Sequence, residues 1–132
     1  MNIKNSKDLV DEAKKKITSF SASETKNLYE KDEITLIDVR DIRELWKEGG
    51  IKNAIHIPRG MLEFWLDPKS SYYKEKKIKD VKKLVLFCAL GMRSALAAKS
   101  LQDMGFKNIA DVEGGFEALK KTGFEIIKKE KK

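Results

Sequence analysis

One run of consecutive apolar residues, Leu84–Cys88 (LVLFC), constrains the fold more than any other part of the sequence. Every position is apolar, which is typical of a strand buried on both faces near the centre of a parallel sheet. A helical pattern follows almost at once, from Arg93 to Met104, and Gly105 ends it. The sequence therefore predicts a strand, a short loop and a helix, which is the repeating unit of an α/β fold.

The rest of the chain repeats this alternation of strand and helix patterns. The predicted strands are Ile17–Phe20, Ile34–Val39, Ala54–Ile57, Leu84–Cys88 and Asn108–Val112. The predicted helices are Ser6–Lys16, a segment capped by Ser21 or Ser23 that runs to about Lys31, Asp41–Glu48, Arg93–Met104 and Phe116–Lys121. Gly60–Lys76 is the least regular stretch. We therefore expect an α/β domain with a largely parallel sheet.

The length of 132 residues fits one domain with a real hydrophobic core. We expect residues 1–16 to form an N-terminal helical extension packed on the domain, residues 17–125 the domain itself, and residues 126–132 a Lys-rich C-terminal tail. The longest apolar run is too short to span a bilayer, and residues 1–10 contain no apolar targeting segment. These features favour a cytoplasmic protein with no membrane partner.

The formal net charge of +7 raises the question of an anionic partner. Most of the basic residues are lysines that are spread among Asp and Glu, which is typical of a solvated surface rather than of a nucleic-acid site. The single cysteine excludes an intramolecular disulfide and a cysteine-based zinc cluster, so we expect no metal and no cofactor. A Cys–His pair could only join Cys88 and His56, and His56 lies within a predicted strand, where a packed or hydrogen-bonded ring is expected.

The chemistry of the chain concentrates at Cys88, which ends the predicted central strand. Ligands of parallel sheets bind just beyond the carboxyl ends of the strands, and a strand–loop–helix junction turns several backbone N–H groups toward that point. Gly91 lets the loop curl, and Arg93 adds a permanent positive charge that favours the thiolate. A buried structural thiol is the alternative, but the loop, the glycine and the arginine together favour a nucleophile.

Four stretches of the sequence resemble a known family in order and spacing. They are LIDVRDIRELW (Leu36–Trp46), GGIKNAIHIPRG (Gly49–Gly60), LVLFCALGMRSALAAKSLQDMGF (Leu84–Phe106) and NIADVEGGFEAL (Asn108–Leu119). Over about residues 17–125 the chain resembles a single-domain rhodanese, a sulfurtransferase. The resemblance implies a three-layer α/β sandwich whose five-stranded, mainly parallel sheet carries helices on both faces. One departure is Gly50, where many members of the family carry a histidine.

The resemblance also assigns roles around the cysteine. Cys88 matches the family's nucleophile, and the matching anion-binding loop consists of Ala89, Leu90, Gly91, Met92 and Arg93, with Ser94 at the helix start. The implied reaction moves a sulfane sulfur from a small anionic donor such as thiosulfate onto Cys88 as a persulfide, and then onto a thiol or cyanide. Because the chain has no second cysteine, the acceptor thiol must belong to another molecule, either small or protein.

Supporting roles are expected for a few further residues. Asp38 and Arg40 match the family's Asp-Val-Arg signature and are expected to hold the active loop by hydrogen bonds. Arg59 and Arg43 either line the path of an anionic substrate or lie on the solvated surface. Glu113 is expected to anchor the chain near the loop, before a tight turn at Gly114-Gly115. We expect an aromatic set to serve packing, namely Trp46, Phe64, Trp65, Tyr72 and Tyr73.

Two alternatives to the sulfurtransferase hypothesis are open. The domain could be a sulfur carrier or protein-binding module with little thiosulfate turnover. A phosphatase or arsenate reductase of related fold is disfavoured, because four residues separate Cys88 from Arg93 here, one fewer than in those phosphatases. The tighter loop suits a sulfur atom on the cysteine. The sequence names neither the physiological donor nor the acceptor.

Overall fold

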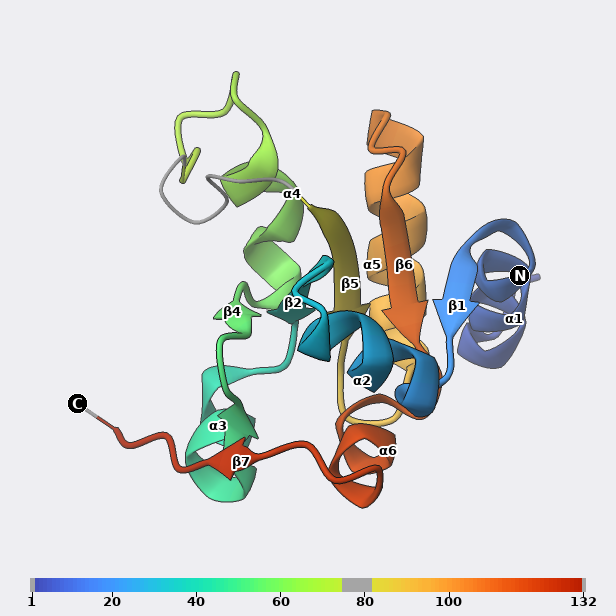
Figure 1. Ribbon diagram of the computed structural model, residues 1–132. Helices are drawn as coiled ribbons and strands as arrows, with labels where there is room; N and C mark the ends of the chain where they lie inside the picture. Colours follow the sequence, from blue (N-terminus) through green and yellow to red (C-terminus); the bar gives the residue numbers. More distant parts are fainter. Residues whose placement is uncertain (1, 75–81, 132) are drawn as a thin grey trace.

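A five-stranded parallel sheet forms the centre of the molecule (Figure 1). The computed structural model describes residues 2–74 and 82–131, so Glu75 and Lys76 of the irregular stretch and Lys132 of the tail lie outside the described residues. In spatial order the strands are β1 (Thr18–Phe20), β6 (Ile109–Val112), β5 (Lys83–Phe87), β2 (Ile34–Asp38) and β4 (Ile55–His56). Each neighbouring pair is parallel. The predicted fold class is therefore confirmed.

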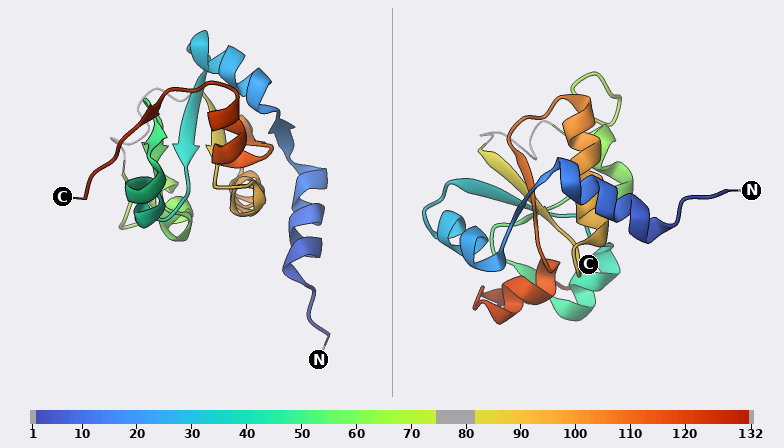
Figure 2. Two further views of the ribbon diagram at one scale, coloured as in Figure 1. Left: turned by 90° about the horizontal axis from the view of Figure 1, so that it is seen from below. Right: turned by 90° about the vertical axis from the view of Figure 1, so that its right-hand side faces the viewer.

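Helices cover both faces of this sheet. They are α1 (Ser6–Lys16), α2 (Ala22–Glu30), α3 (Ile42–Glu48), α4 (Leu62–Leu66), which follows the 3-10 turn η1 (Arg59–Met61), α5 (Met92–Met104) and α6 (Gly115–Lys121). Figure 2 shows α2 and α6 on one side of the sheet and α4 and α5 on the other. Among the described residues, no helix is long and apolar enough to cross a membrane.

The two-sided burial of β5 explains why Leu84–Phe87 are all apolar. Leu84 and Leu86 point into the core beneath α4 and α5, whereas Val85 and Phe87 point into the core beneath α2 and α6. Burial on both faces removes the alternation that a half-exposed strand would show. This strand pairs with β2 on one side and β6 on the other, so it lies near the middle of the sheet, as predicted.

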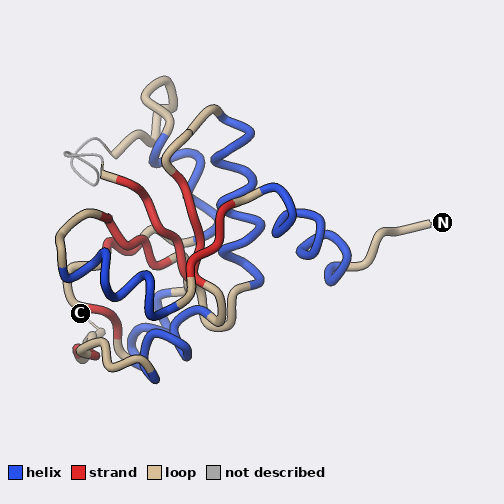
Figure 3. The backbone as a smooth tube through the Cα atoms, turned by 45° about the vertical axis from the view of Figure 1, so that its right-hand side comes forward, coloured by secondary structure: helices blue, strands red, loops and turns tan. Residues whose placement is uncertain are grey.

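The N-terminal helix α1 packs beside α5, beyond the β1 edge of the sheet (Figure 3). Val10 and Ala13 are its buried side chains, and the Gln102 side chain of α5 donates a hydrogen bond to the Lys16 carbonyl. The burial of these two apolar residues and the hydrogen bond from Gln102 attach the lysine-rich helix α1 to the domain. The division of the chain at residues 16 and 125 remains a prediction.

A small second sheet lies outside the predicted elements. β3 (Gly50–Ile51) pairs antiparallel with β7 (Ile126–Ile127). The stretch expected to be a tail therefore starts with a strand, and Gly49, which ends α3, packs against it. Gly49 has φ +83°, and a Cβ there would lie 2.9 Å from the Ile127 carbonyl oxygen. Neither strand lies in an apolar run like the one that predicted β4 at Ala54–Ile57.

Candidate functional site

Three loops meet at the carboxyl edge of the sheet. Cys88 directly follows β5, Val39 and Arg40 follow β2, and Glu113 follows β6. The three strands are parallel neighbours, so their ends lie side by side, where open α/β sheets bind ligands.

The thiol of Cys88 lies at the centre of a tight loop. Its Sγ accepts hydrogen bonds from the backbone N–H groups of Gly91, at 3.1 Å, and Ser94, at 3.4 Å. Gly91 adopts φ +105°, and a Cβ there would lie 3.3 Å from the Gly114 backbone nitrogen. Cys88 is only 1% exposed, but N–H groups that converge on sulfur favour a negative charge there. The site combines burial with the donors that a thiolate requires.

The rim of the loop is apolar. Leu90 and Met92 are 60% and 56% exposed, respectively, whereas the Gly91 backbone between them is buried. These two exposed apolar side chains flank the backbone donors of the loop.

Arg93 makes its strongest contact with a residue that the sequence did not single out. Its guanidinium donates to both carboxylate oxygens of Glu44 in α3, at 2.6 and 3.0 Å. This pairing lowers the pKa of Glu44 and raises the pKa of Arg93. Cys88 and Asp38 are lesser contributors to the raised pKa of Arg93. The charge of Arg93 is thus near the thiol, while Glu44 fixes its position.

Asp38 and Arg40 form a buried ion pair at the end of β2. The Arg40 guanidinium donates to both oxygens of Asp38, at 2.7 Å for the shorter contact, and both side chains are almost fully buried. It also donates to the Gly49 carbonyl at 2.9 Å and lies 4.0 Å from the centroid of the Phe116 ring. The pair thus contacts the α3–β3 turn, α6 and, at 5.9 Å, the ring of Phe87 just before Cys88.

The start of α6 holds the Cys88 loop directly. The Phe116 N–H donates to the Cys88 carbonyl at 2.7 Å, and the Glu117 N–H donates to the Ala89 carbonyl at 3.3 Å. This approach requires Gly115, because a Cβ there would lie 2.4 Å from the Cys88 carbonyl oxygen. Glu113 has an exposed side chain, and its N–H binds the Phe20 carbonyl. The glycines, more than Glu113, bring the chain to the loop.

The other basic candidates form ion pairs on the surface. Arg59 pairs with Glu63 of α4 at 2.9 Å, and Arg43 pairs with its helix cap, Asp41, at 2.9 Å. Hydrogen bonding from Arg43 lowers the pKa of Asp41 to about 2. Nothing in the part of the chain that the structure describes connects either arginine to Cys88.

The histidine and Trp65 occupy packing positions, whereas Phe64, Tyr72 and Tyr73, which were expected to pack, are exposed. The His56 Nε2 lies 2.7 Å from the Arg40 carbonyl oxygen, so its ring is hydrogen-bonded, as predicted. Trp65 packs against the core, while Phe64 and Tyr72 contact each other edge to face at the surface. Over residues 2–74 and 82–131, no group of three or more Cys, His, Asp or Glu side chains could hold a metal ion.

A buried carboxylate behind Cys88 escaped the sequence-based reasoning. The Ser94 hydroxyl lies 3.6 Å from Cys88 Sγ and donates to Asp111 of β6 at 3.2 Å. Burial is the main cause that raises the pKa of Asp111. In the sequence no base stands beside Ser94, but β6 lies next to β5 in the sheet, with Asp111 opposite Leu86. The available signal was an acidic residue inside the apolar strand IADV.

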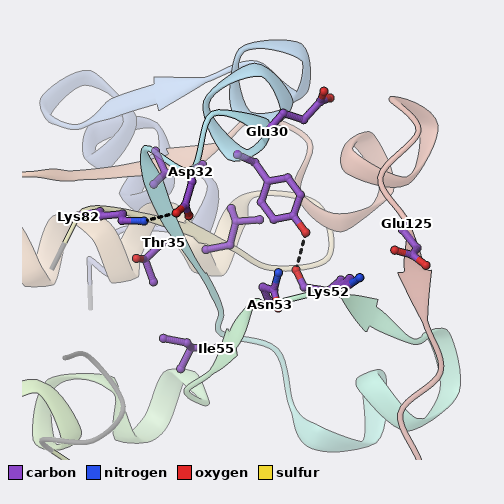
Figure 4. Close-up of a pocket in the computed structure, with 11 residues that line it drawn as sticks. Glu30, Asp32, Thr35, Lys52, Asn53, Ile55, Lys82 and Glu125 are labelled. Atoms are coloured by element: carbon purple, nitrogen blue, oxygen red, sulfur yellow. Dashed lines mark hydrogen bonds and ion pairs between the residues drawn. The ribbon is translucent and has the colours of Figure 1, made fainter. Parts of the chain in front are cut away.

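Cavity size does not mark this site. A cavity of about 750 Å³ lies at the opposite, amino end of β2, lined in part by Thr35, Lys52 and Lys82 (Figure 4). Two interactions join residues that line this cavity. Lys82 forms an ion pair with Asp32, and the Tyr29 hydroxyl donates a hydrogen bond to the Lys52 carbonyl. None of the lining residues belongs to the Cys88 loop.

Comparisons with known proteins agree with this geometry. A family model described as the rhodanese-like domain matches residues 21–122. The chain is 33% identical over 101 residues to the thiosulfate sulfurtransferase GlpE of Coxiella burnetii, a match that covers 76% of this chain and 85% of that protein.

Two solved structures extend the similarity over nearly the whole chain. A protein of unknown function from Rhodopseudomonas palustris, described as a possible tyrosine phosphatase, is 40% identical with a TM-score of 0.89 and covers 96% of this chain and 97% of its own. The polysulfide-sulfur transferase homodimer of Wolinella succinogenes is 37% identical with a TM-score of 0.71, covering 92% of this chain and 85% of its own.

Proposed function

The chain belongs to the rhodanese-like domain family, and from this premise we propose that it is a sulfurtransferase that carries a sulfane sulfur as a persulfide on Cys88. The observation that carries the proposal is the convergence of the Gly91 and Ser94 N–H groups on Cys88 Sγ. Relatives of this chain include a thiosulfate sulfurtransferase and a polysulfide-sulfur transferase. Thiosulfate is the donor we propose to test first.

The loading step is a displacement at sulfur. The Cys88 thiolate attacks the outer sulfur of thiosulfate, a new S–S bond forms, and the bond to the sulfite group breaks. Sulfite leaves with the electron pair of that bond, and the negative charge of the persulfide stays on its outer sulfur. The backbone donors of the loop and the charge of Arg93 would stabilise that anion.

Unloading requires a second molecule. An acceptor thiolate or cyanide attacks the outer sulfur and takes it, and the Cys88 thiolate is restored. Cys88 is the one cysteine of the chain, so this protein offers no thiol of its own for the step. We propose a reducing compartment, the cytoplasm, as the place where Cys88 stays a free thiol.

The spacing of the loop argues against phosphate ester hydrolysis. Four residues lie between Cys88 and Arg93, and Arg93 is held by Glu44. A phosphate needs a wider ring of N–H donors than a single sulfur atom does.

The test of the proposal is the intact mass of the protein before and after incubation with thiosulfate. We expect the mass to increase by one sulfur atom, cyanide or a small thiol to remove that increase, and Cys88→Ser to show no increase. The serine variant differs by one atom at the reacting position, so we expect its fold to be unchanged. Circular dichroism against the parent chain checks this.

Two outcomes would contradict the proposal. The first is an unchanged mass with both thiosulfate and polysulfide as donors. The second is release of phosphate from an aryl phosphate at a rate that depends on Cys88, which would instead support a phosphatase.

A further inference from the structure

A chain of hydrogen bonds runs from Cys88 to a buried carboxylate and on to β1. Cys88 Sγ lies 3.6 Å from Ser94 Oγ, and the Ser94 hydroxyl lies 3.2 Å from Asp111 Oδ2. The other oxygen of Asp111 accepts a 2.6 Å hydrogen bond from the Ser19 hydroxyl. Ser94 and Asp111 are both almost fully buried.

The number of hydrogens in this chain fixes the direction of its bonds. A serine hydroxyl has one hydrogen to donate and two lone pairs. While Asp111 is ionised, both of its oxygens accept, so the hydrogen of Ser94 points to Asp111. The lone pairs of Ser94 then face Cys88, and the sulfur must be the donor, which requires a thiol.

The thiolate reverses this arrangement. It has no hydrogen to donate, so the Ser94 hydroxyl must turn its hydrogen toward the sulfur. Asp111 then loses one of its donors unless it carries a proton itself and donates to Ser94 Oγ. The charge state of Cys88 and the protonation of Asp111 are therefore linked through one hydroxyl group.

The surroundings of Asp111 support proton uptake. Burial is the largest cause that raises its pKa, and Glu113, which follows the strand of Asp111, acts in the same direction, while the hydrogen bonds from Ser19 and Ser94 and the charge of Lys14 in α1 lower it. Near Cys88, the charged groups are Arg93, which is paired with Glu44, and Asp38, which is paired with Arg40. A buried carboxyl with a raised pKa and two serine donors therefore lies behind the thiol.

We propose that Asp111 is a positioning residue for Cys88, which sets the direction of the Ser94 hydroxyl and receives, through it, the proton that Cys88 gives up. The S–H bond of Cys88 breaks and its proton passes to Ser94 Oγ, while the Ser94 proton passes to Asp111 Oδ2. The products are a thiolate and a neutral carboxylic acid, with no change in total charge or oxidation state. The use of this thiolate for sulfur transfer rests on the proposed function.

The experiment follows the ultraviolet absorbance of the thiolate as a function of pH, with the Cys88→Ser spectrum subtracted. Because the chain has one cysteine, the difference reports Cys88 alone. Two groups that share a proton titrate as a pair, so we expect the thiolate of the parent chain to form in two steps. Asp111→Asn, which keeps the shape but carries neither the charge nor the proton, is expected to form its thiolate in a single step.

Two further variants separate this role from a purely structural one. Ser94→Ala cuts the link between Cys88 and Asp111 and is likewise expected to form its thiolate in a single step. Ser19→Ala removes the donor on the far side of Asp111 and is expected to retain both steps. The inference is overturned by a single step in the parent chain, or by two steps in folded Asp111→Asn or Ser94→Ala, with folding checked by the urea midpoint.

This test is independent of the proposed reaction, because the absorbance requires no sulfur donor. If the protein takes up sulfur but its thiolate forms in one step, the inference fails and the proposed function stands. If the thiolate forms in two steps that depend on Asp111 but no sulfur is taken up, the proposed function fails and the proton link stands.

Discussion

At the scale of single residues, the missing side chain of Gly115 shapes the site as much as the cysteine does. Its φ of +57° lies in the left-handed region, and its Cα lies so close to the Cys88 loop that a Cβ would be 2.8 Å from the carbonyl carbon of Ala89. That approach lets the Phe116 N–H reach the Cys88 carbonyl. With a larger residue at position 115, α6 could not come close enough for its N–H groups to bind the carbonyls of Cys88 and Ala89.

Gly115→Ala is expected to lower the free energy of unfolding by about 2–4 kcal/mol, because left-handed strain and overpacking against backbone atoms add together. Gly105→Ala is the matched control: φ there is +108°, but no atom lies within 4 Å of the added Cβ. Only strain remains, and we expect a loss of about 1 kcal/mol. The comparison uses urea unfolding, and equal losses in the two variants would show that the contact with the loop has no energetic weight.

Single residues also show which parts of the site the sequence could supply. Cys88, Gly91 and Ser94 are neighbours in the chain, so the loop and its backbone donors followed from the local pattern. Asp38 and Arg40 were expected to hold the active loop by hydrogen bonds, but the hydrogen bonds between their side chains and to Gly49 point elsewhere, because the fold brings Gly49 and Phe116 to them.

At the scale of elements, α3 is tied to the start of α5 through Glu44 and Arg93. Asp41 caps α3 through reciprocal hydrogen bonds with Glu44, and Glu44 then pairs with Arg93. One carboxylate therefore serves both the helix cap and the arginine beside Cys88. The capping pattern of Asp41 and Glu44 is visible in the sequence, but the pairing of Glu44 with Arg93 depends on where α5 begins.

Glu44→Gln tests this tie through the pH dependence of stability. Hydrogen bonds from Arg93 lower the folded-state pKa of Glu44 below the ordinary value of 4.5. The stabilisation is therefore present above pH 4.5 and is lost as the pH falls through the lowered pKa. At neutral pH we expect the variant to lose about 0.5–1 kcal/mol, since the pair is partly exposed, and in acid we expect no difference from the parent chain.

Urea midpoints at neutral and acidic pH give this comparison. Glu48→Gln is the control, because it removes the same charge at an exposed position of the same helix. A loss that is the same at both pH values, or the same in both variants, would contradict a specific pairing of Glu44 with Arg93.

The short strands show where prediction of elements stops. The strands of the main sheet and all of the longer helices lie close to their predicted places, because burial of one or both faces leaves a periodic pattern. β3 and β7 have two residues each, and neither lies in a longer apolar run such as the one that predicted β4, also of two residues, at Ala54–Ile57. Their pairing joins segments that are far apart in the chain, and only the folded molecule brings them together.

At the scale of the whole molecule, one sheet separates two hydrophobic cores. β5 contributes side chains to both of them, so neither core can lose its packing without disturbing the strand that carries Cys88. The two layers are therefore expected to unfold together.

Leu86→Ala is expected to lower the free energy of unfolding by about 2–5 kcal/mol, because it removes a fully buried side chain. Val85→Ala, on the opposite face of β5, is expected to cost less because fewer methyl groups are lost. In both variants, unfolding by urea should remain one transition. Circular dichroism and tryptophan fluorescence, from Trp46 and Trp65, would give different midpoints if the two layers unfolded separately.

The sequence by itself determined the alternation of strands and helices, the central place of Leu84–Cys88 and the loop that surrounds the thiol. These features depend on residues that are close together in the chain, so local periodicity and loop composition reveal them. Only the tertiary structure decided the order of the strands, the pairing of Arg93 with Glu44, the placement of Asp111 behind Ser94 and the pairing of β3 with β7. Each of these joins residues that are distant in sequence, and their proximity results from how the strands assemble into one sheet.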